Sequence, residues 1–285
     1  MDRGLIFSLL ATFLWSTVAT SFKLTLKYIT FKEMLFYSSL TSFLILFLIY
    51  FLNFKKNLFK ISKREIFNSI ILGFLNPYLY YLVLFKAYSL LRAQIAQPLN
   101  YTWPIILTFL STFFLKTKIR FINIISLLVS FLGVIVIATE GEFKTIKVES
   151  KLGAVLALLS SFIFSSYWIL NLKDKRSDIE KLTTNFLFGF LYIFLTQIFT
   201  DSIRIPPLKG LIGSIYIGLF EMGVTYLIWL YALKKSKNIA VTSNLIYLSP
   251  FISLFLISLI LKEKIMLSSI IGLLIIVLGI LLNRF

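Results

Sequence analysis

PIILTFLSTFFLKTKI, at Pro104–Ile119, returns as PFISLFLISLILKEKI at Pro250–Ile265. A shift of 146 residues aligns the two stretches without a gap, and eight of the sixteen positions are identical. The identical pairs are Pro104/Pro250, Ile106/Ile252, Phe109/Phe255, Leu110/Leu256, Leu115/Leu261, Lys116/Lys262, Lys118/Lys264 and Ile119/Ile265. The same shift places Gly133 on Gly279. A repeat with this register indicates that the chain consists of two related halves.

The amino-acid composition is that of a membrane protein. Hydrophobic residues make up 59% of the 285 residues and the mean hydropathy is +0.92, whereas a soluble domain is about 45–50% apolar. The chain has no Cys and no His, which excludes thiol nucleophiles, disulfides, imidazole bases and most transition-metal sites. We therefore predict an all-α integral membrane protein that is not an enzyme and has no cofactor or metal site.

Apolar segments long enough to cross a membrane recur along the whole chain. A helix needs about 20 residues to cross the roughly 30 Å hydrocarbon core. Ten segments meet this length approximately: 4–23, 33–52, 66–88, 94–115, 120–139, 151–171, 181–200, 209–233, 239–261 and 266–283. We predict two five-helix repeats, residues 1–140 and 151–285, joined by a linker at 141–150. Because five is odd, the second repeat enters the membrane from the opposite side, and the repeats are inverted.

The charge pattern predicts how the protein lies in the membrane. The net charge is +17, and Lys and Arg cluster in the short segments between apolar runs, where they set topology and meet anionic lipid. With the N-terminus inside, 17 of the 29 Lys and Arg residues fall on the inner side. We therefore expect a multi-pass protein of the cytoplasmic (inner) membrane with both termini in the cytoplasm. Membrane lipid is its expected partner, nucleic acid is not, and we expect a monomer or a weak homo-oligomer.

Glu221 is the only acidic residue inside an apolar run. A charge at the bilayer centre costs about 2.5–3.5 kcal/mol on insertion scales, so this side chain must face protein or water. One interpretation is a contact to a substrate amine or a proton-coupling carboxylate. The other is a structural ion pair with Lys23 or Lys86 near the outer ends of the helices.

The fourth apolar segment carries a polar face. Gln97, Asn100 and Pro104 share one side of a helix at spacings of three and four, with Tyr101 and Trp103 beside them. Pro104 frees a backbone carbonyl about one turn earlier, which predicts a hinge next to a substrate contact. The ninth segment repeats this arrangement with Asn244, Tyr247 and Pro250. The alternative is that both prolines only kink their helices for packing.

These features resemble the drug/metabolite transporter superfamily, EamA type. The resemblance rests on the ten segments in two repeats, on Trp15-Ser16 with Lys23 in the first segment, and on a Pro followed by a charged corner. That corner keeps its Glu as Glu263 in the second repeat and has Thr117 in the first. The segment Asn100–Pro104, NYTWP, is similar to the Asn-Tyr-x-Trp-Pro pattern of the bacterial aromatic-amino-acid exporter branch.

The resemblance implies a basket of ten helices around a central cavity. Carried over by position, the cavity lining comprises Trp15, Tyr78, Tyr81, Asn100, Tyr101, Trp103, Trp168, Asn244 and Tyr247. Glu221 stands where the family more often has a small residue, so it adds a charge to the cavity.

The expected function is export of a small-molecule substrate by alternating access, with amino acids as the first substrate class. An exporter of lipophilic or quaternary cations is the alternative within transport, since aromatic rings and Glu221 also suit a cation. A structural or non-transport membrane protein is the alternative of another class.

Overall fold

The computed structural model describes residues 3–53, 61–114, 121–139, 141, 150–200, 203–235 and 245–282. Over these residues the chain is helical and contains no strand. In the first half the elements are α1 (Arg3–Thr25), α2 (Phe31–Asn53), α3 (Lys63–Gly73), η1 (Phe74–Leu79), α4 (Tyr80–Leu90), α5 (Ala93–Asn100), α6 (Trp103–Phe114) and α7 (Phe121–Ala138). In the second half they are α8 (Lys151–Lys173), α9 (Asp178–Thr200), α10 (Leu208–Ile217), η2 (Gly218–Gly223), α11 (Val224–Lys235), η3 (Leu245–Leu248), α13 (Ser249–Leu256), η4 (Ile257–Leu261) and α14 (Leu267–Leu282).

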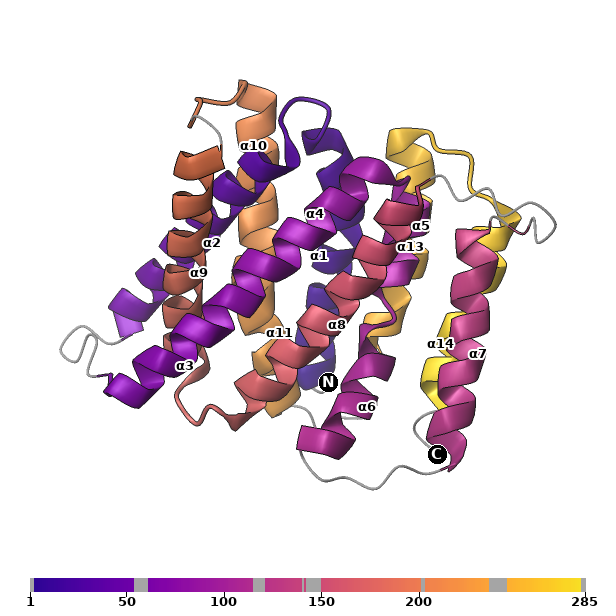
Figure 1. Cartoon of the computed structure of the whole chain (residues 1–285), viewed down its shortest axis with the longest axis horizontal. Helices are drawn as coiled ribbons and strands as arrows, with labels where there is room; N and C mark the ends of the chain where they lie inside the picture. Colours follow the sequence, from indigo (N-terminus) through magenta and orange to yellow (C-terminus); the bar gives the residue numbers. More distant parts are fainter. Residues whose placement is uncertain are drawn as a thin grey trace.

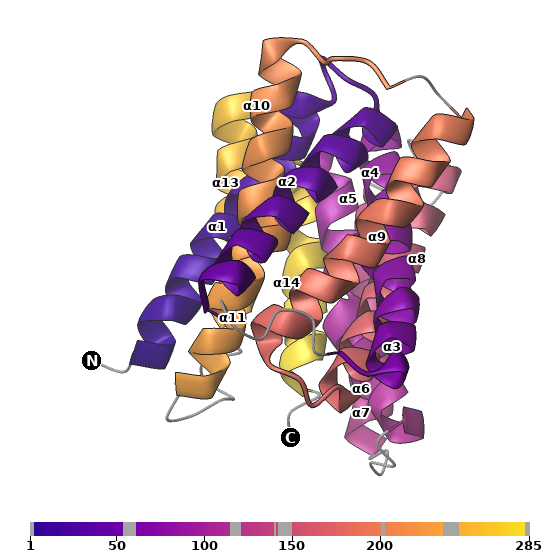
Figure 2. The ribbon, with the colours of Figure 1, turned by 90° about the vertical axis from the view of Figure 1, so that its left-hand side faces the viewer.

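The helices form one bundle whose outer surface is apolar. Six described helical stretches are long and apolar enough to cross a membrane: Arg3–Thr25, Phe31–Asn53, Lys63–Leu90, Lys151–Asn171, Asp178–Thr200 and Leu208–Ala232. Three shorter apolar helices accompany them. Helix α1 begins and α14 ends at the same end of the bundle (Figures 1 and 2), which we call the terminus end. The predicted all-α membrane class is confirmed, and the count of ten spans stays a prediction.

The fourth predicted segment is not one helix. The expectation of a continuous span over 94–115 is wrong, because α5 ends at Asn100 and α6 begins at Trp103. Tyr101 leaves the helical region with φ −69° and ψ 6°. Pro104 is therefore the second residue of a new helix, where a missing N–H costs little. Pro250 has the same place in α13, which begins at Ser249, so neither proline kinks the middle of a helix.

Two long spans are interrupted by π-helical segments. In the span that contains α3 and α4, η1 separates the two helices, and Asn76 has the non-helical angles φ −150° and ψ 121°. In the span that contains α10 and α11, η2 contains Glu221. A π-helical segment widens the turn and changes which backbone groups pair within the helix, and such bulges are frequent at functional sites.

Glycines allow the interrupted spans to pack closely on their neighbours. A Cβ atom on Gly189 of α9 would overlap the ring of Pro77 in η1, and one on Gly218 of η2 would overlap the backbone oxygen of Ser38 in α2. Each interrupted span therefore packs on a helix of the other half of the chain. At the edge of the bundle, α7 and α14 pack on each other (Figure 1).

Candidate functional site

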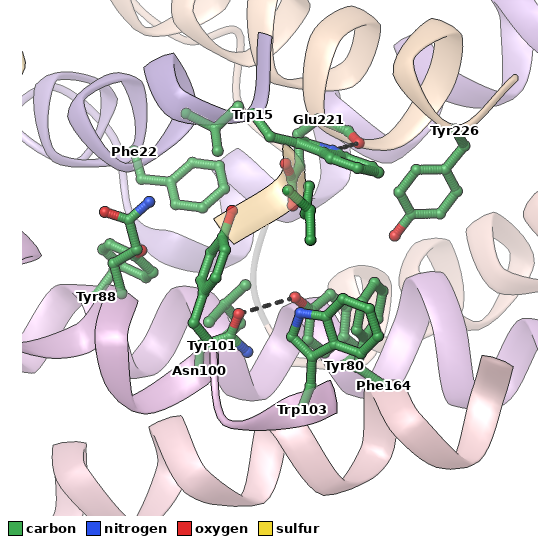
Figure 3. A pocket seen from close by; sticks show the side chains of 14 residues that line it. Trp15, Phe22, Tyr80, Tyr88, Asn100, Tyr101, Trp103, Phe164, Glu221 and Tyr226 are labelled. Carbon is green, nitrogen blue, oxygen red and sulfur yellow. Dashed lines mark hydrogen bonds between the residues drawn. The ribbon is translucent and has the colours of Figure 1, made fainter. Parts of the chain in front are cut away.

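A central cavity lies between the helices of the two halves. It has a volume of about 50 Å³, which is room for a few water molecules. Five of the predicted site residues line it: Trp15, Asn100, Tyr101, Trp103 and Glu221. Figure 3 shows Trp15 and Glu221 on one wall and Asn100, Tyr101, Tyr80 and Trp103 on the facing wall. The cavity is too small for a metabolite-sized substrate, so the conformation is closed. Side chains or helices must move before such a substrate can enter.

Glu221 reaches the cavity from the η2 bulge. The residue is 8% exposed, and Tyr81 Oη donates a hydrogen bond to its Oε1 at 3.2 Å. Its second carboxyl oxygen, Oε2, is buried and has no hydrogen-bond partner among the described residues. The backbone oxygen of Glu221 accepts a hydrogen bond from Trp15 Nε1 at 3.2 Å, which fixes the indole against the bulge. A buried carboxyl oxygen without a donor is costly, so it is a position at which a ligand donor is stabilising.

A chain of hydrogen bonds leads away from Glu221. Tyr81 Oη lies 3.0 Å from Tyr226 Oη, and Asn76 Nδ2 donates to Tyr226 Oη at 3.3 Å. All four residues are buried. This chain joins the two interrupted spans, because Asn76 belongs to η1 and Glu221 to η2.

The wall opposite Glu221 is built from α4, α5 and α8. Tyr80 Oη donates to Asn100 Oδ1 at 3.4 Å, and Asn100 Nδ2 donates to Ser160 Oγ at 2.8 Å. The Asn100 amide is thereby held by both of its ends. At the break between α5 and α6, Tyr101 Oη donates to Ser249 Oγ at 2.8 Å. The break thus turns Tyr101 toward α13 of the other half.

The remaining predicted site residues lie elsewhere. Tyr81 stands behind Glu221 and does not line the cavity. Trp168 packs on the rings of Phe164 and Tyr226, with centroid distances of 5.8 and 5.6 Å. Tyr78 faces a different, smaller space, where its hydroxyl accepts a hydrogen bond from Thr196 Oγ1 at 3.0 Å. Its ring lies beside Tyr192 at 5.7 Å. Asn244 and the side chains of Tyr247 and Pro104 lie outside the described residues.

Neither lysine proposed as a partner of Glu221 lies against it. Lys23 Nζ donates to the backbone oxygens of Tyr88 and Leu91 at 3.1 and 2.9 Å. Lys86 Nζ lies over the ring of Phe31, 5.0 Å from its centroid. Among the described residues, no lysine or arginine forms an ion pair with Glu221, and no cluster of three His, Cys, Asp or Glu residues could hold a metal ion.

Sequence reasoning missed most of the aromatic lining. The additional aromatic residues are Phe22, Tyr80, Tyr88, Phe164 and Tyr226, and the aliphatic ones are Val18, Leu84 and Ile246. Gln97, noted for its position on the polar face, also lines the cavity, and its Oε1 is buried with no hydrogen-bond partner in the part of the chain that the structure describes. Because 17% of the residues are aromatic, the presence of an aromatic residue in a segment does not indicate whether its ring lines the cavity. Helical spacing from Trp15 to Phe22 and from Tyr80 to Tyr88, two turns each, was the signal available.

Comparisons with known proteins agree on a transporter. An uncharacterized transporter of Clostridium kluyveri is 28% identical over 60% of this chain and 57% of its own length. An uncharacterized transporter of Archaeoglobus fulgidus is 31% identical over 62% of each chain. This chain thus spans about three fifths of the length of these curated relatives.

A solved structure, described only as the crystal structure of a protein, has the same fold. It covers 100% of this chain and 99% of its own, with a TM-score of 0.70 and 18% identity, so it bears on the fold alone. The EamA-like transporter family matches residues 2–139 and 151–285. The bundle of apolar helices and this match over nearly the whole chain lead to one conclusion: the protein is a multi-pass membrane protein that belongs to the EamA-like transporter family of the drug/metabolite transporter superfamily.

Proposed function

We propose that this transporter exports small amphiphilic organic amines across the cytoplasmic membrane by alternating access. One observation carries the proposal: the cavity contains an unpaired carboxyl oxygen, Glu221 Oε2, surrounded by aromatic rings. Among the described residues that line the cavity there is no Lys or Arg. The charged group that such a cavity stabilises is a cation.

The physical basis is compensation of a buried charge. A carboxylate in a water-poor cavity is costly unless a cation pairs with it. A substrate ammonium supplies that cation and donates to Oε2, which no group in the described part of the chain does. Aromatic faces such as those of Trp15 and Tyr226, 6.2 Å apart between centroids, attract the same cation and accept the apolar part of the molecule.

Amino acids are the second candidate, and the position of Lys23 favours them. The substrate carboxylate of an amino acid needs a donor, preferably a cation. Lys23 follows the cavity-lining residue Phe22, and its Nζ is bound to the backbone oxygen of Tyr88, which also lines the cavity. Recruiting Lys23 would break that bond, so this geometry ranks an amino acid below a simple amine.

Alternating access is supported by the relation between the halves. Helices α6 and α13 begin at residues 103 and 249, and α7 and α14 begin at residues 121 and 267. Both pairs differ by the 146-residue shift of the repeated stretch. The family match also divides into two ranges. Because α1 begins and α14 ends at one end of the bundle, we place both termini in the cytoplasm, following the charge pattern.

The test uses two ligands that share a ring and an amine and differ only in a carboxylate. Uptake of labelled phenethylamine and of labelled phenylalanine is measured in proteoliposomes containing the purified wild type or Glu221→Gln. We expect uptake of phenethylamine only, and its loss in Glu221→Gln. Uptake of phenylalanine without phenethylamine would replace this proposal with the amino-acid candidate. Uptake of neither, by protein shown to be folded, would contradict both.

A further inference from the structure

A second space opens at the terminus end of the bundle. It is a groove of about 500 Å³ between the starts of α1 and α9 and the middle of α11. It is lined by Phe7, Asp178, Ile179, Leu227, Ile228 and Tyr231. These residues lie near the start of α1, at the start of α9 and in the middle of α11, whose end meets the starts of α1 and α9 at the terminus end (Figures 1 and 2).

The groove and the central cavity follow one another along the same helices. Trp15 of the cavity is eight residues after Phe7 of the groove, which is about 12 Å along α1. On α11, Tyr226 of the cavity is followed directly by Leu227 and Ile228 of the groove, and Tyr231 of the groove comes five residues after Tyr226. Figure 3 shows Tyr226 at one end of the cavity and Phe22 and Tyr88 at the other. Tyr226 therefore stands at the end of the cavity that faces the groove.

The ring of Tyr226 closes this end by contacts to three other helices. Its centroid lies 6.2 Å from that of Trp15 on α1, 5.6 Å from Trp168 on α8 and 6.2 Å from Phe186 on α9. Trp229, three residues after Tyr226 on α11, lies 5.5 Å from Trp15. Tyr226 itself is only 1% exposed. An aromatic layer thus separates the two spaces, and Tyr226 is its most connected member.

The hydroxyl of Tyr226 is connected to Glu221 in a fixed order. A tyrosine hydroxyl has one proton to donate, and that of Tyr81 is donated to Glu221 Oε1. In the 3.0 Å contact between the two hydroxyls, Tyr226 must therefore be the donor. Asn76 Nδ2 donates in turn to Tyr226. Each hydroxyl donates once and accepts once, and the chain of donors ends on the carboxyl group.

We propose that Tyr226 is the gate between the cavity and the terminus end, and that its hydroxyl couples this gate to Glu221 through Tyr81. The proposal rests on the proposed function in taking Glu221 as the ligand site. A cationic amine at Oε2 keeps Glu221 charged, and a charged acceptor strengthens a hydrogen bond about twofold. The strengthened chain holds the ring of Tyr226 in place. Ligand binding therefore stabilises the closed terminus end.

The experiment measures access to the cavity without any substrate. The natural chain has no Cys, so a single Val18→Cys reports on the cavity and a single Ile228→Cys on the groove. Each reporter is labelled with a membrane-impermeant maleimide in vesicles of both orientations. The gate variants are Tyr226→Ala, which removes the ring, and Tyr226→Phe, which removes only the hydroxyl. Glu221→Leu removes the acceptor, and Tyr78→Phe is the matched control outside the cavity.

From the terminus end, we expect Val18→Cys to be labelled at least about tenfold faster with Tyr226→Ala. With Tyr226→Phe, which loses the hydroxyl bonds to Tyr81 and Asn76, labelling should be at least roughly fivefold faster, the effect of one net hydrogen bond. Glu221→Leu, which loses only the bond from Tyr81, should speed the labelling of Val18→Cys by no more than Tyr226→Phe does. The double variant should be labelled no faster than Tyr226→Phe alone, because both changes break one chain. Tyr78→Phe should leave the labelling rate of Val18→Cys unchanged. The labelling rate of Ile228→Cys should be the same in all variants. If Glu221→Leu does not fold, Tyr81→Phe takes its place in the cycle.

Two results would overturn the proposal. One is an unchanged labelling rate in Tyr226→Ala, which would place the gate elsewhere. The other is full multiplication of the Tyr226→Phe and Glu221→Leu effects, which would show that ring and carboxyl group act separately. Because labelling requires no substrate, failure of amine transport with the expected labelling would reject the proposed substrate class and leave the gate intact.

Discussion

The two interrupted spans differ in what their bulges present to the centre of the protein. Segment η1, at Phe74–Leu79, presents the amide of Asn76 and packs its Pro77 on a glycine of α9. Segment η2, at Gly218–Gly223, presents the carboxyl group of Glu221. Both are six residues long, and both end on the same chain of hydrogen bonds through Tyr81 and Tyr226.

This difference suggests that the two bulges have different roles. A bulge in a membrane helix is tolerated where neighbouring helices satisfy the backbone groups that it frees. In η2 the backbone oxygen of Phe220 accepts from Thr225 Oγ1, and that of Glu221 accepts from Trp15. We infer that η2 binds the ligand, whereas η1 supplies the neutral end of the chain that responds to it.

The largest effect is expected for ligand binding at η2, when the charge of Glu221 is removed. Glu221→Gln keeps the shape of the side chain and removes its charge, so the dissociation constant for phenethylamine should rise up to about a hundredfold, the loss of a charged hydrogen bond of about 1.5–3 kcal/mol. Tyr78→Phe, in η1, should leave it within about twofold, since Tyr78 lies outside the cavity. Binding is measured by scintillation proximity on purified protein. An equal loss of affinity for phenethylamine in both variants would show that the two bulges do not differ in ligand binding.

A smaller effect is expected where each bulge packs on its neighbour. Gly218→Ala forces a methyl group against the backbone of Ser38, and Gly189→Ala forces one against Pro77. Overpacking of this kind costs about 1–3 kcal/mol. Gly210→Ala is the matched control, because its Cβ would meet mainly a side-chain methyl group of Ile29. Thermal unfolding in detergent should show lower transition temperatures for the first two variants than for Gly210→Ala, and no difference would show that the close approach is not required.

The smallest effect concerns the support of α3, the helix that leads to η1. Outside the membrane-spanning part, Arg176 binds Asp174 Oδ2 at 2.5 Å and Ser69 of α3 at 2.8 Å. Burial acts to raise the pKa of Asp174, but the hydrogen bonds and charge of Arg176 outweigh it and hold the pKa below its usual value. A lowered folded-state pKa means that the stabilisation is present above the unfolded value and is lost as pH falls through the folded value.

Asp174→Asn should therefore lower the unfolding temperature at neutral pH by a few degrees at most, and the difference from wild type should vanish toward acid pH. The measurement is thermal unfolding of both proteins from pH 7 to the most acidic pH at which both stay soluble. A difference that grows as the pH falls would contradict the sign of the pKa shift.

Several features could be predicted from the sequence because each depends on residues that are close together in the chain. Apolar length indicated the membrane helices, and the match between Pro104–Ile119 and Pro250–Ile265 indicated the two halves. Glu221 stood out because an acid in an apolar run is costly in any fold. Asn100, Tyr101 and Trp103 could be placed together because they are neighbours on one short segment.

The tertiary structure decided what distant residues do to one another. Tyr226 and Tyr81 are separated by 145 residues and meet only when α4 packs near α11, so no periodicity within either helix could reveal their contact. The end of α5 after Asn100 and the bulges at Asn76 and Glu221 depend on partners such as Ser160, Trp15 and Tyr226 that accept or supply the hydrogen bonds. Local sequence thus determined which segments enter the membrane and where the charge lies. Packing between the two halves decided which rings surround that charge, because burial and hydrogen bonding are properties of pairs of residues brought together by the fold.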